Sequence, residues 1–173
     1  MIDTERLIRK AAAYGIDVAP VVRKLDEYAA LLVEYNQKVN LTAITDAEGI
    51  EDRHFIDSLL LAARPEVCGR MVDVGTGAGF PGIVAKLFRP ELDLTLMEPT
   101  GKRVDFLKYA CSALGVEAEF AKERAEEAAR KQWRESFDGH GPGRGRTAGA
   151  GRVLPALAEA GRRVHCHERQ RRG

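Results

Sequence analysis

Apolar residues recur at helical spacing through the first third of the chain. Residues 3–14 and 20–39 each carry an apolar stripe at the i, i+3, i+4 positions of an amphipathic helix. A short connector follows at residues 41–46, where Thr45 or Asp46 could cap the next helix. Residues 47–65 are again helical, in two pieces, and Pro65 closes the second piece. The pattern therefore predicts an all-helical N-terminal cap.

From Arg70 onward the pattern changes to short apolar runs that alternate with helical segments. Strands are predicted at 71–74, 92–99 and 116–124, with a lead-in to a fourth at 135–138. Helices are predicted at 82–90, 101–115 and 125–133. Strands that alternate with helices in this way imply βαβ units and a parallel sheet. The predicted fold class is therefore α/β.

Composition places the chain among single-domain proteins of ordinary size. Its 173 residues are 45% hydrophobic and 31% charged, which supplies one core and a normal surface. No apolar stretch reaches the roughly 18–20 residues that a membrane span needs, and the N-terminus lacks the apolar segment of a signal peptide. The three cysteines form no C-x-x-C pair, which favours a reducing compartment. We therefore expect a cytoplasmic protein that does not contact membranes.

A glycine-rich turn at residues 75–79, G-T-G-A-G, follows the first predicted strand and is called the glycine loop below. Glycine permits a sharp turn and lets a ligand approach the main chain without a Cβ clash. The dinucleotide fingerprint would need a glycine where Phe80 stands, and no P-loop G-K-[ST] follows. Glu98 ends the second strand 23 residues after Gly75, where a carboxylate can accept from both ribose hydroxyls. With Asp73 leading in, this spacing favours an adenosine-binding loop over a purely structural turn.

Four segments give the sequence a more specific resemblance. They are NLTAI, RHFIDSLLL, DVGTGAGFPGIVAKLFRP and GKRVDFLKYACSALGV, in this order. Over residues from about 20 to 138 the chain closely resembles the glucose-inhibited division protein B family. Members of that family are S-adenosylmethionine-dependent methyltransferases that form 7-methylguanine in 16S ribosomal RNA. The resemblance implies a Rossmann-like methyltransferase fold, S-adenosylmethionine as cofactor and small-subunit ribosomal RNA as partner.

The resemblance also implies a set of cofactor-binding residues. Gly75 and Phe80 would line the path of the methionine and adenosine, and Glu98 would hold the ribose. The pair Ala125-Glu126 would flank the adenine. The complete implied set is Asp73, Gly75, Gly77, Gly79, Phe80, Glu98, Thr100, Ala125 and Glu126.

Four further residues fall in the family's N-terminal block, where cofactor and RNA would meet: Asn40, Arg53, His54 and Asp57. A histidine at a helical position is more often packed or capping than functional, and Arg53 could equally be a solvated ion-pair partner. Guanine N7 already presents a lone pair, so the implied reaction needs no general base and depends on positioning and electrostatics. We therefore name no catalytic residue and expect no metal.

Residues 139–173, called the tail below, differ from everything before them. They carry eight Arg, two acidic residues and eight of the 17 glycines, whereas residues 1–138 carry 19 basic and 24 acidic side chains. The tail has no aromatic residue and too few large apolar groups to repay the entropy of folding. One interpretation is an arginine–glycine RNA-binding tail, which would make the chain a non-catalytic RNA-binding module. The other is a reading-frame error, since GC-rich codons for residues 139–145 shifted by one base read V-T-A-R-A-V. That is the Arg-bearing strand a family member would have here, and we favour this interpretation.

The sequence thus predicts three parts: a helical cap (1–65), a partial Rossmann-like methyltransferase domain (66–138) and the tail. We expect a monomer whose sheet stops after three strands, with its C-terminal strands missing. An exposed apolar edge and half a cofactor pocket would then leave low stability and weak or absent activity. The H-C-H triplet at 165–167 is not expected to bind metal, because three consecutive residues cannot easily face one ion. A nicotinamide-dependent oxidoreductase would need a glycine at position 80 and a proton-donating residue, and the sequence shows neither, which disfavours this class.

Overall fold

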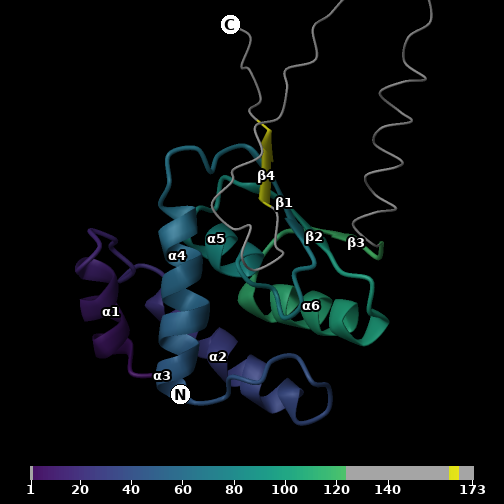
Figure 1. Cartoon of the computed structure of the whole chain (residues 1–173), viewed down its shortest axis with the longest axis horizontal. Coiled ribbons are helices and arrows are strands. Elements are labelled where there is room, and N and C mark those ends of the chain that lie inside the picture. The colour runs from purple at the N-terminus through teal and green to yellow at the C-terminus, as the bar shows by residue number, and fades with distance from the viewer. Residues whose placement is uncertain (1, 124–163, 168–173) are drawn as a thin grey trace, which may run out of the picture.

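The computed structural model describes residues 2–123 and 164–167 of the chain (Figure 1). Its elements, in chain order, are α1 (Thr4–Ala12), α2 (Val22–Asn36), α3 (Ala47–Gly49), the π-helix η1 (Ile50–Ile56), α4 (Asp57–Ala62), β1 (Arg70–Val74), α5 (Gly82–Phe88), β2 (Asp93–Met97), α6 (Gly101–Leu114), β3 (Glu119–Ala121) and β4 (Val164–His167). Up to β3 the helices and strands lie where the apolar pattern predicted them, with ends shifted by a few residues. None of the helices within these ranges is both long and apolar enough to cross a membrane.

The sheet contains three parallel strands, in the order β3-β2-β1, and a fourth strand beside β1. Arg70 of β1 lies opposite Asp93 of β2, and Thr95 of β2 lies opposite Glu119 of β3. Parallel neighbours need a crossover, which α5 supplies between β1 and β2 and α6 between β2 and β3. The alternating strands and helices confirm the predicted α/β class and form the first part of a Rossmann-like fold.

The fourth strand corrects the expectation of a bare sheet edge. β4 lies antiparallel to β1, with Arg70 opposite His167 and Asp73 opposite Val164, and it includes the H-C-H triplet. An edge strand offers backbone donors and acceptors that an extended segment of almost any sequence can pair with. The apolar pattern therefore gave no sign of this pairing. The predicted helix at 125–133, the lead-in at 135–138 and most of the tail lie outside the described residues.

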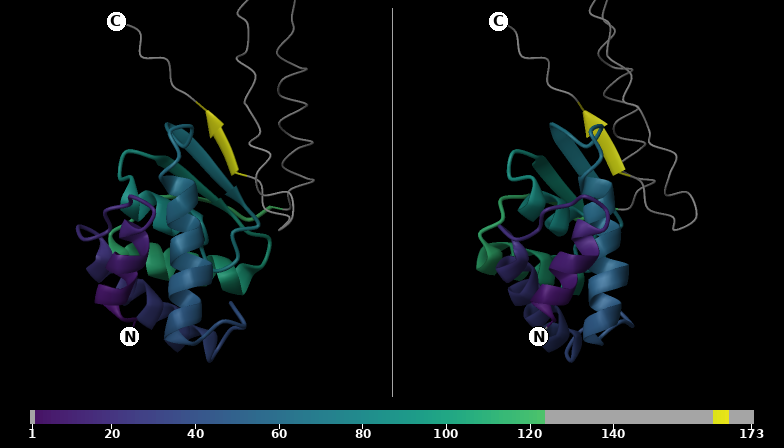
Figure 2. Two further views of the ribbon diagram at one scale, coloured as in Figure 1. Left: turned by 60° about the vertical axis from the view of Figure 1, so that its left-hand side comes forward. Right: turned by 90° about the vertical axis from the view of Figure 1, so that its left-hand side faces the viewer.

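The helices gather on one face of the sheet (Figure 2). On that face Met71, Leu94 and Leu96 are at most 1% exposed, while Val72 and Val74, which alternate with them on the opposite face, are only half-buried. α5 contacts β1, β2 and α4, and α6 contacts α2. One apolar cluster runs from Ile2 in the cap to Val116 after α6, so the cap and the sheet share a single core.

The last helix of the cap is continuous from Ala47 to Ala62 and changes type along its length. Its middle seven residues, η1, form a π-helix, a wide turn that proteins often use at functional sites. Asp46 is the N-cap, since its carboxylate accepts from the Gly49 N–H at 2.7 Å. Of the two capping residues that the sequence suggested, the structure thus selects the aspartate.

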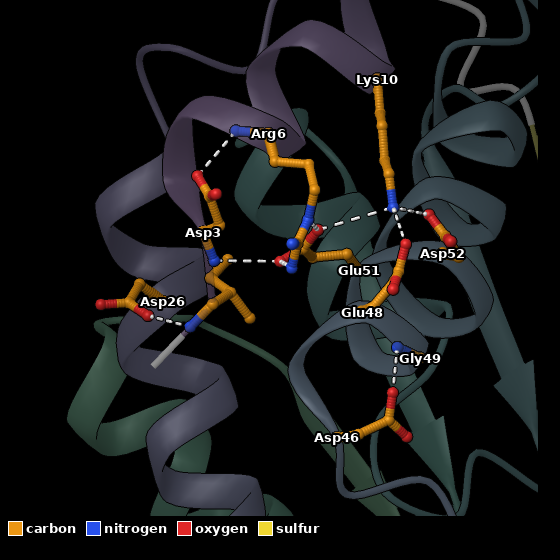
Figure 3. Close-up of polar contacts among 10 residues, drawn as sticks. Asp3, Arg6, Lys10, Asp26, Asp46, Glu48, Gly49, Glu51 and Asp52 are labelled. Carbon is orange, nitrogen blue, oxygen red and sulfur yellow. Dashed lines mark hydrogen bonds and ion pairs between the residues drawn. The ribbon is translucent and has the colours of Figure 1, made fainter.

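A buried ion pair ties the first helix to η1 (Figure 3). The fully buried carboxylate of Glu51 accepts from the Arg6 guanidinium at 2.6 and 2.7 Å and from the Asp3 N–H at 2.9 Å. Burial acts to raise the pKa of Glu51, but the Arg6 hydrogen bond and the Asp3 N–H outweigh it and hold that pKa below its usual range. Lys10 also binds η1, since its Nζ donates to Asp52 Oδ1 at 2.6 Å, and this bond raises the Lys10 pKa.

Candidate functional site

The glycine loop adopts a backbone that side chains other than glycine rarely allow. Gly75, Gly77 and Gly79 have φ values of 69°, 58° and 95°. The N–H groups of Gly75 and Thr76 both donate to the Met97 carbonyl, at 2.8 and 3.2 Å, and so join the loop to the end of β2. A Cβ built on Gly75 would meet no atom within 4 Å. The outer side of the loop is therefore open backbone that a ligand can approach.

Asp73 shapes this loop from beneath. Its side chain is fully buried, and Oδ2 accepts from Thr76 Oγ1 at 2.5 Å and from the Gly82 N–H at 2.9 Å. A Cβ on Gly82 would lie 2.6 Å from Leu96 Cδ2 and 2.8 Å from that same Oδ2, so a larger residue there would force these side chains to shift. These bonds go to the loop and to the start of α5. The carboxylate therefore sets the form of the turn, and a place for Asp73 among the cofactor ligands stays a prediction.

Glu98 lies directly after β2 with its carboxylate against the loop. Oε2 accepts from the Gly77 N–H at 3.1 Å, Oε1 accepts from the Thr100 N–H at 3.0 Å, and the side chain is 3% exposed. Arg103 Nη1 lies 4.0 Å from Oε1. A carboxylate has about four acceptor positions, and these two N–H groups use two of them. Glu98 can thus accept two further hydrogen bonds, the number that a ribose diol offers.

Phe80 turns its ring toward the cap. The ring is 4% exposed and lies between Tyr28, with centroids 5.0 Å apart, and His54, with centroids 4.3 Å apart and an interplanar angle of 6°. His54 Nε2 is hydrogen-bonded to Thr42 Oγ1 at 3.0 Å, and the Thr42 oxygen accepts a separate bond from the Ile44 N–H. His54 is therefore packed between the loop and Thr42, and its predicted place on the RNA side stays a prediction. Any contact of Phe80 with a ligand would come from its backbone.

The remaining residues of the N-terminal block, Asn40, Arg53 and Asp57, are exposed. Arg53 is in η1 and Asp57 begins α4, where desolvation and the nearby Asp52 raise the Asp57 pKa. The Asn40 carbonyl accepts from Arg103 Nη2 at 3.4 Å. The block thus adjoins the predicted cofactor residues at two points, through His54 on Phe80 and through Arg103 beside Glu98.

Three residues that hold this arrangement were not predicted as site residues. Tyr28 was assigned only to the apolar stripe of its helix, and Arg103 only to a helical segment. Asn36 holds the turn after α2, since its Oδ1 accepts from the N–H groups of Leu41 and Thr42 at 2.7 and 3.0 Å. An asparagine at a helix end is the one sequence signal that could have indicated this.

Part of the predicted site is not described. Ala125 and Glu126 lie outside the described residues, so their predicted place beside the adenine stays a prediction. Within residues 2–123 and 164–167, no group of three or more His, Cys, Asp or Glu side chains is arranged to hold a metal ion. The arrangement that the structure does show is an open glycine loop with one carboxylate against it.

Comparison with known proteins gives consistent matches. Residues 21–139 match the GidB family, described as rRNA small subunit methyltransferase G. Proteins named Ribosomal RNA small subunit methyltransferase G are 44% identical over 147 residues in Moorella thermoacetica (80% of this chain, 60% of the relative) and 43% over 120 residues in Mycoplasma capricolum (68% and 51%). The protein of that name in Alkaliphilus metalliredigens is 46% identical over 121 residues (68% and 51%). The chain thus spans between half and three-fifths of the length of these relatives.

Proposed function

Because the chain belongs to the rRNA small subunit methyltransferase G family, we propose that its glycine loop and Glu98 bind S-adenosylmethionine. The open loop backbone and the Glu98 carboxylate, a hydrogen-bond acceptor, suit the methionine and ribose parts of that molecule. Gly75 leaves open backbone on the outer side of the loop, and Glu98 keeps two acceptor positions beyond its bonds to Gly77 and Thr100. When bound, S-adenosylmethionine supplies a methyl group activated by the adjoining sulfonium.

We further propose that the methyl acceptor is N7 of a guanine in small-subunit ribosomal RNA. Because N7 carries its own lone pair, the residues of this chain need only orient the guanine toward the methyl group and do not have to remove a proton from it. Glu98 would fix the ribose, and the loop backbone would hold the methionine end. Arg53 is exposed and Arg103 is 37% exposed, so both can place positive charge where a phosphate backbone would approach.

The observation that best supports this proposal is the position of the Glu98 carboxylate, which lies between the loop and the start of α6. The test is a titration of the full chain with S-adenosylmethionine, followed by amide NMR. We expect shifts at Gly77 and Thr100 and a dissociation constant of about 0.1–1 mM, weak because the sequence predicts only half of the cofactor pocket. Unmoved Gly77 and Thr100 signals at saturation would exclude the loop as the site. Micromolar binding would instead overturn the expectation of weak activity.

The eight arginines of residues 139–173 favour a second proposal, RNA binding by the tail without catalysis. β4, at residues 164–167, contains none of them, so all eight can be changed to glutamine without altering that strand. If the tail binds RNA, this variant loses affinity and its binding becomes nearly independent of salt. RNA affinity and salt dependence equal to those of the unaltered chain would remove this proposal.

A further inference from the structure

Tyr28 makes a direct bond from the cap to the glycine loop. It lies on α2, its side chain is fully buried, and its hydroxyl donates to the Ala78 carbonyl, 50 residues further along the chain. Burial raises the pKa of Tyr28 well above its usual value, so the hydroxyl keeps its proton as a donor. A buried tyrosine hydroxyl needs a partner, and here the partner is a loop carbonyl.

This bond controls the orientation of a whole peptide unit. Because a peptide is planar, fixing the Ala78 carbonyl also fixes the direction of the Gly79 N–H. That N–H donates to the Thr76 carbonyl at 2.9 Å, and the Phe80 N–H donates to the same oxygen at 3.3 Å. The internal hydrogen bonds of the loop therefore depend on where Tyr28 holds Ala78.

The fit between Tyr28 and the loop leaves no spare space. A Cβ on Gly79 would lie 2.5 Å from the Tyr28 hydroxyl oxygen and 2.5 Å from Ile83 Cδ1. On the next residue, the Phe80 ring is stacked between Tyr28 and His54. The cap thus contacts the inner side of the loop at Ala78 and Gly79 and also contacts the next residue, Phe80, whereas the outer side at Gly75 is open.

We propose that Tyr28 is a positioning residue for the cofactor, and that through it the cap holds the loop backbone in the form that binds S-adenosylmethionine. This inference rests on the proposed function of the loop. A tyrosine that only filled the core would affect the stability of the whole chain and not the loop in particular. The two roles therefore differ in what a substitution does to the loop alone.

The test compares Tyr28→Phe with two controls in the full chain. Tyr14→Phe removes the hydroxyl of a tyrosine that is 61% exposed. Cys111→Ala removes a buried thiol from α6. This thiol lies near Tyr28, and burial raises its pKa to about 12. The Cys111 variant therefore weakens the core beside Tyr28 but leaves the Tyr28 hydroxyl and every residue of the loop in place. Thermal unfolding measures how much stability each variant loses.

The readouts are amide hydrogen exchange at Gly79 and Phe80 and the dissociation constant for S-adenosylhomocysteine from NMR titration. We expect Tyr28→Phe to speed exchange at both amides about fivefold and to weaken binding by a similar factor, because one buried hydrogen bond is lost. In Tyr28→Phe, the amides of Leu94 and Leu96 in β2 should exchange at the same rate as in Cys111→Ala. Tyr14→Phe should change neither the exchange rates nor the dissociation constant.

Equal loop exchange in Tyr28→Phe and Cys111→Ala would overturn the inference, since both would then act only through the core. Failure of the unaltered chain to respond to S-adenosylhomocysteine would refute the proposed function instead. In that case loop exchange alone still decides whether Tyr28 positions the loop. The two failures are therefore distinguishable.

Discussion

The Arg6 guanidinium donates to both oxygens of the buried Glu51 carboxylate, at 2.6 and 2.7 Å, across 45 residues of sequence. The Arg6 side chain is 32% exposed and that of Glu51 is 0% exposed. An ion pair with one buried partner is costly to break, because the buried charge is then left without an opposite charge to stabilise it. This contact makes α1 part of the support for η1, the segment that carries Arg53 and His54.

Glu51→Gln should lower the free energy of unfolding by about 2–3 kcal/mol, below the value for fully buried pairs because Arg6 reaches solvent. Chemical denaturation of both proteins measures the difference. The control is Asp52→Asn, which removes one of the two exposed partners of Lys10 and should cost less than about 1 kcal/mol. Equal losses in the two variants would mean that the Glu51 contact contributes no more than a surface pair.

The same carboxylate predicts a response to acid. The pKa of Glu51 is lower in the folded chain than its usual value, so its stabilisation is complete above the unfolded pKa of about 4.3. It is lost as the pH falls through the folded pKa. The stability gap between the unaltered chain and Glu51→Gln should therefore be constant near neutral pH and should shrink below about pH 4. A gap that stayed constant on acidification would contradict this assignment.

Gly82→Ala tests how tightly the loop is held. The new methyl group would lie 2.6 Å from Leu96 Cδ2 and 2.8 Å from Asp73 Oδ2, and such overpacking costs about 1–3 kcal/mol of stability. Gly101→Ala is the matched control, because its Cβ would meet only the flexible end of Lys122, at 3.1 Å. The control should stay within about 0.5 kcal/mol of the unaltered chain in thermal unfolding. A neutral Gly82→Ala would show that Asp73 can move.

Glu98→Gln should weaken binding of S-adenosylmethionine about tenfold, because hydrogen bonds to a charged acceptor are stronger than those to an amide oxygen. Glu91→Gln makes the same chemical change at a side chain that is 60% exposed and bonded to Arg89. It should leave the dissociation constant unchanged in the same titration. If both variants bind like the unaltered chain, Glu98 does not hold the ribose.

The apolar pattern predicted the strands and helices of residues 2–123 well, because each has its own period and a clear end signal. Gly115, for example, was predicted to end α6 and has a left-handed φ of 64°. The pattern did not predict that the middle of the last cap helix is a π-helix. A π-helix differs from an α-helix in which backbone N–H and C=O groups are hydrogen-bonded, and the spacing of apolar residues does not indicate this difference.

The site was predicted in part. The glycine loop and Glu98 could be found because a strand, a turn and a carboxylate follow each other at fixed spacing in one βα unit. The contact of Tyr28 could not, since a buried tyrosine looks the same in sequence whatever it bonds to. The helix-end position of Asn36 indicates a contact in the following turn but not which N–H groups it accepts from. Tertiary packing decides that Tyr28 donates to Ala78 and not to another acceptor.

The pairing of β4 also has a consequence for the order in which the sheet assembles. Arg70 and its partner Asp93 are 23 positions apart, whereas Asp73 and its partner Val164 are 91 apart. Closing the longer loop costs about 1.2 kcal/mol more in chain entropy, and contacts between distant residues form slowly. The three parallel strands all lie within residues 70–121, so they can pair while the ribosome is still synthesising the remainder. β4 can join only afterwards, onto an edge that is already formed.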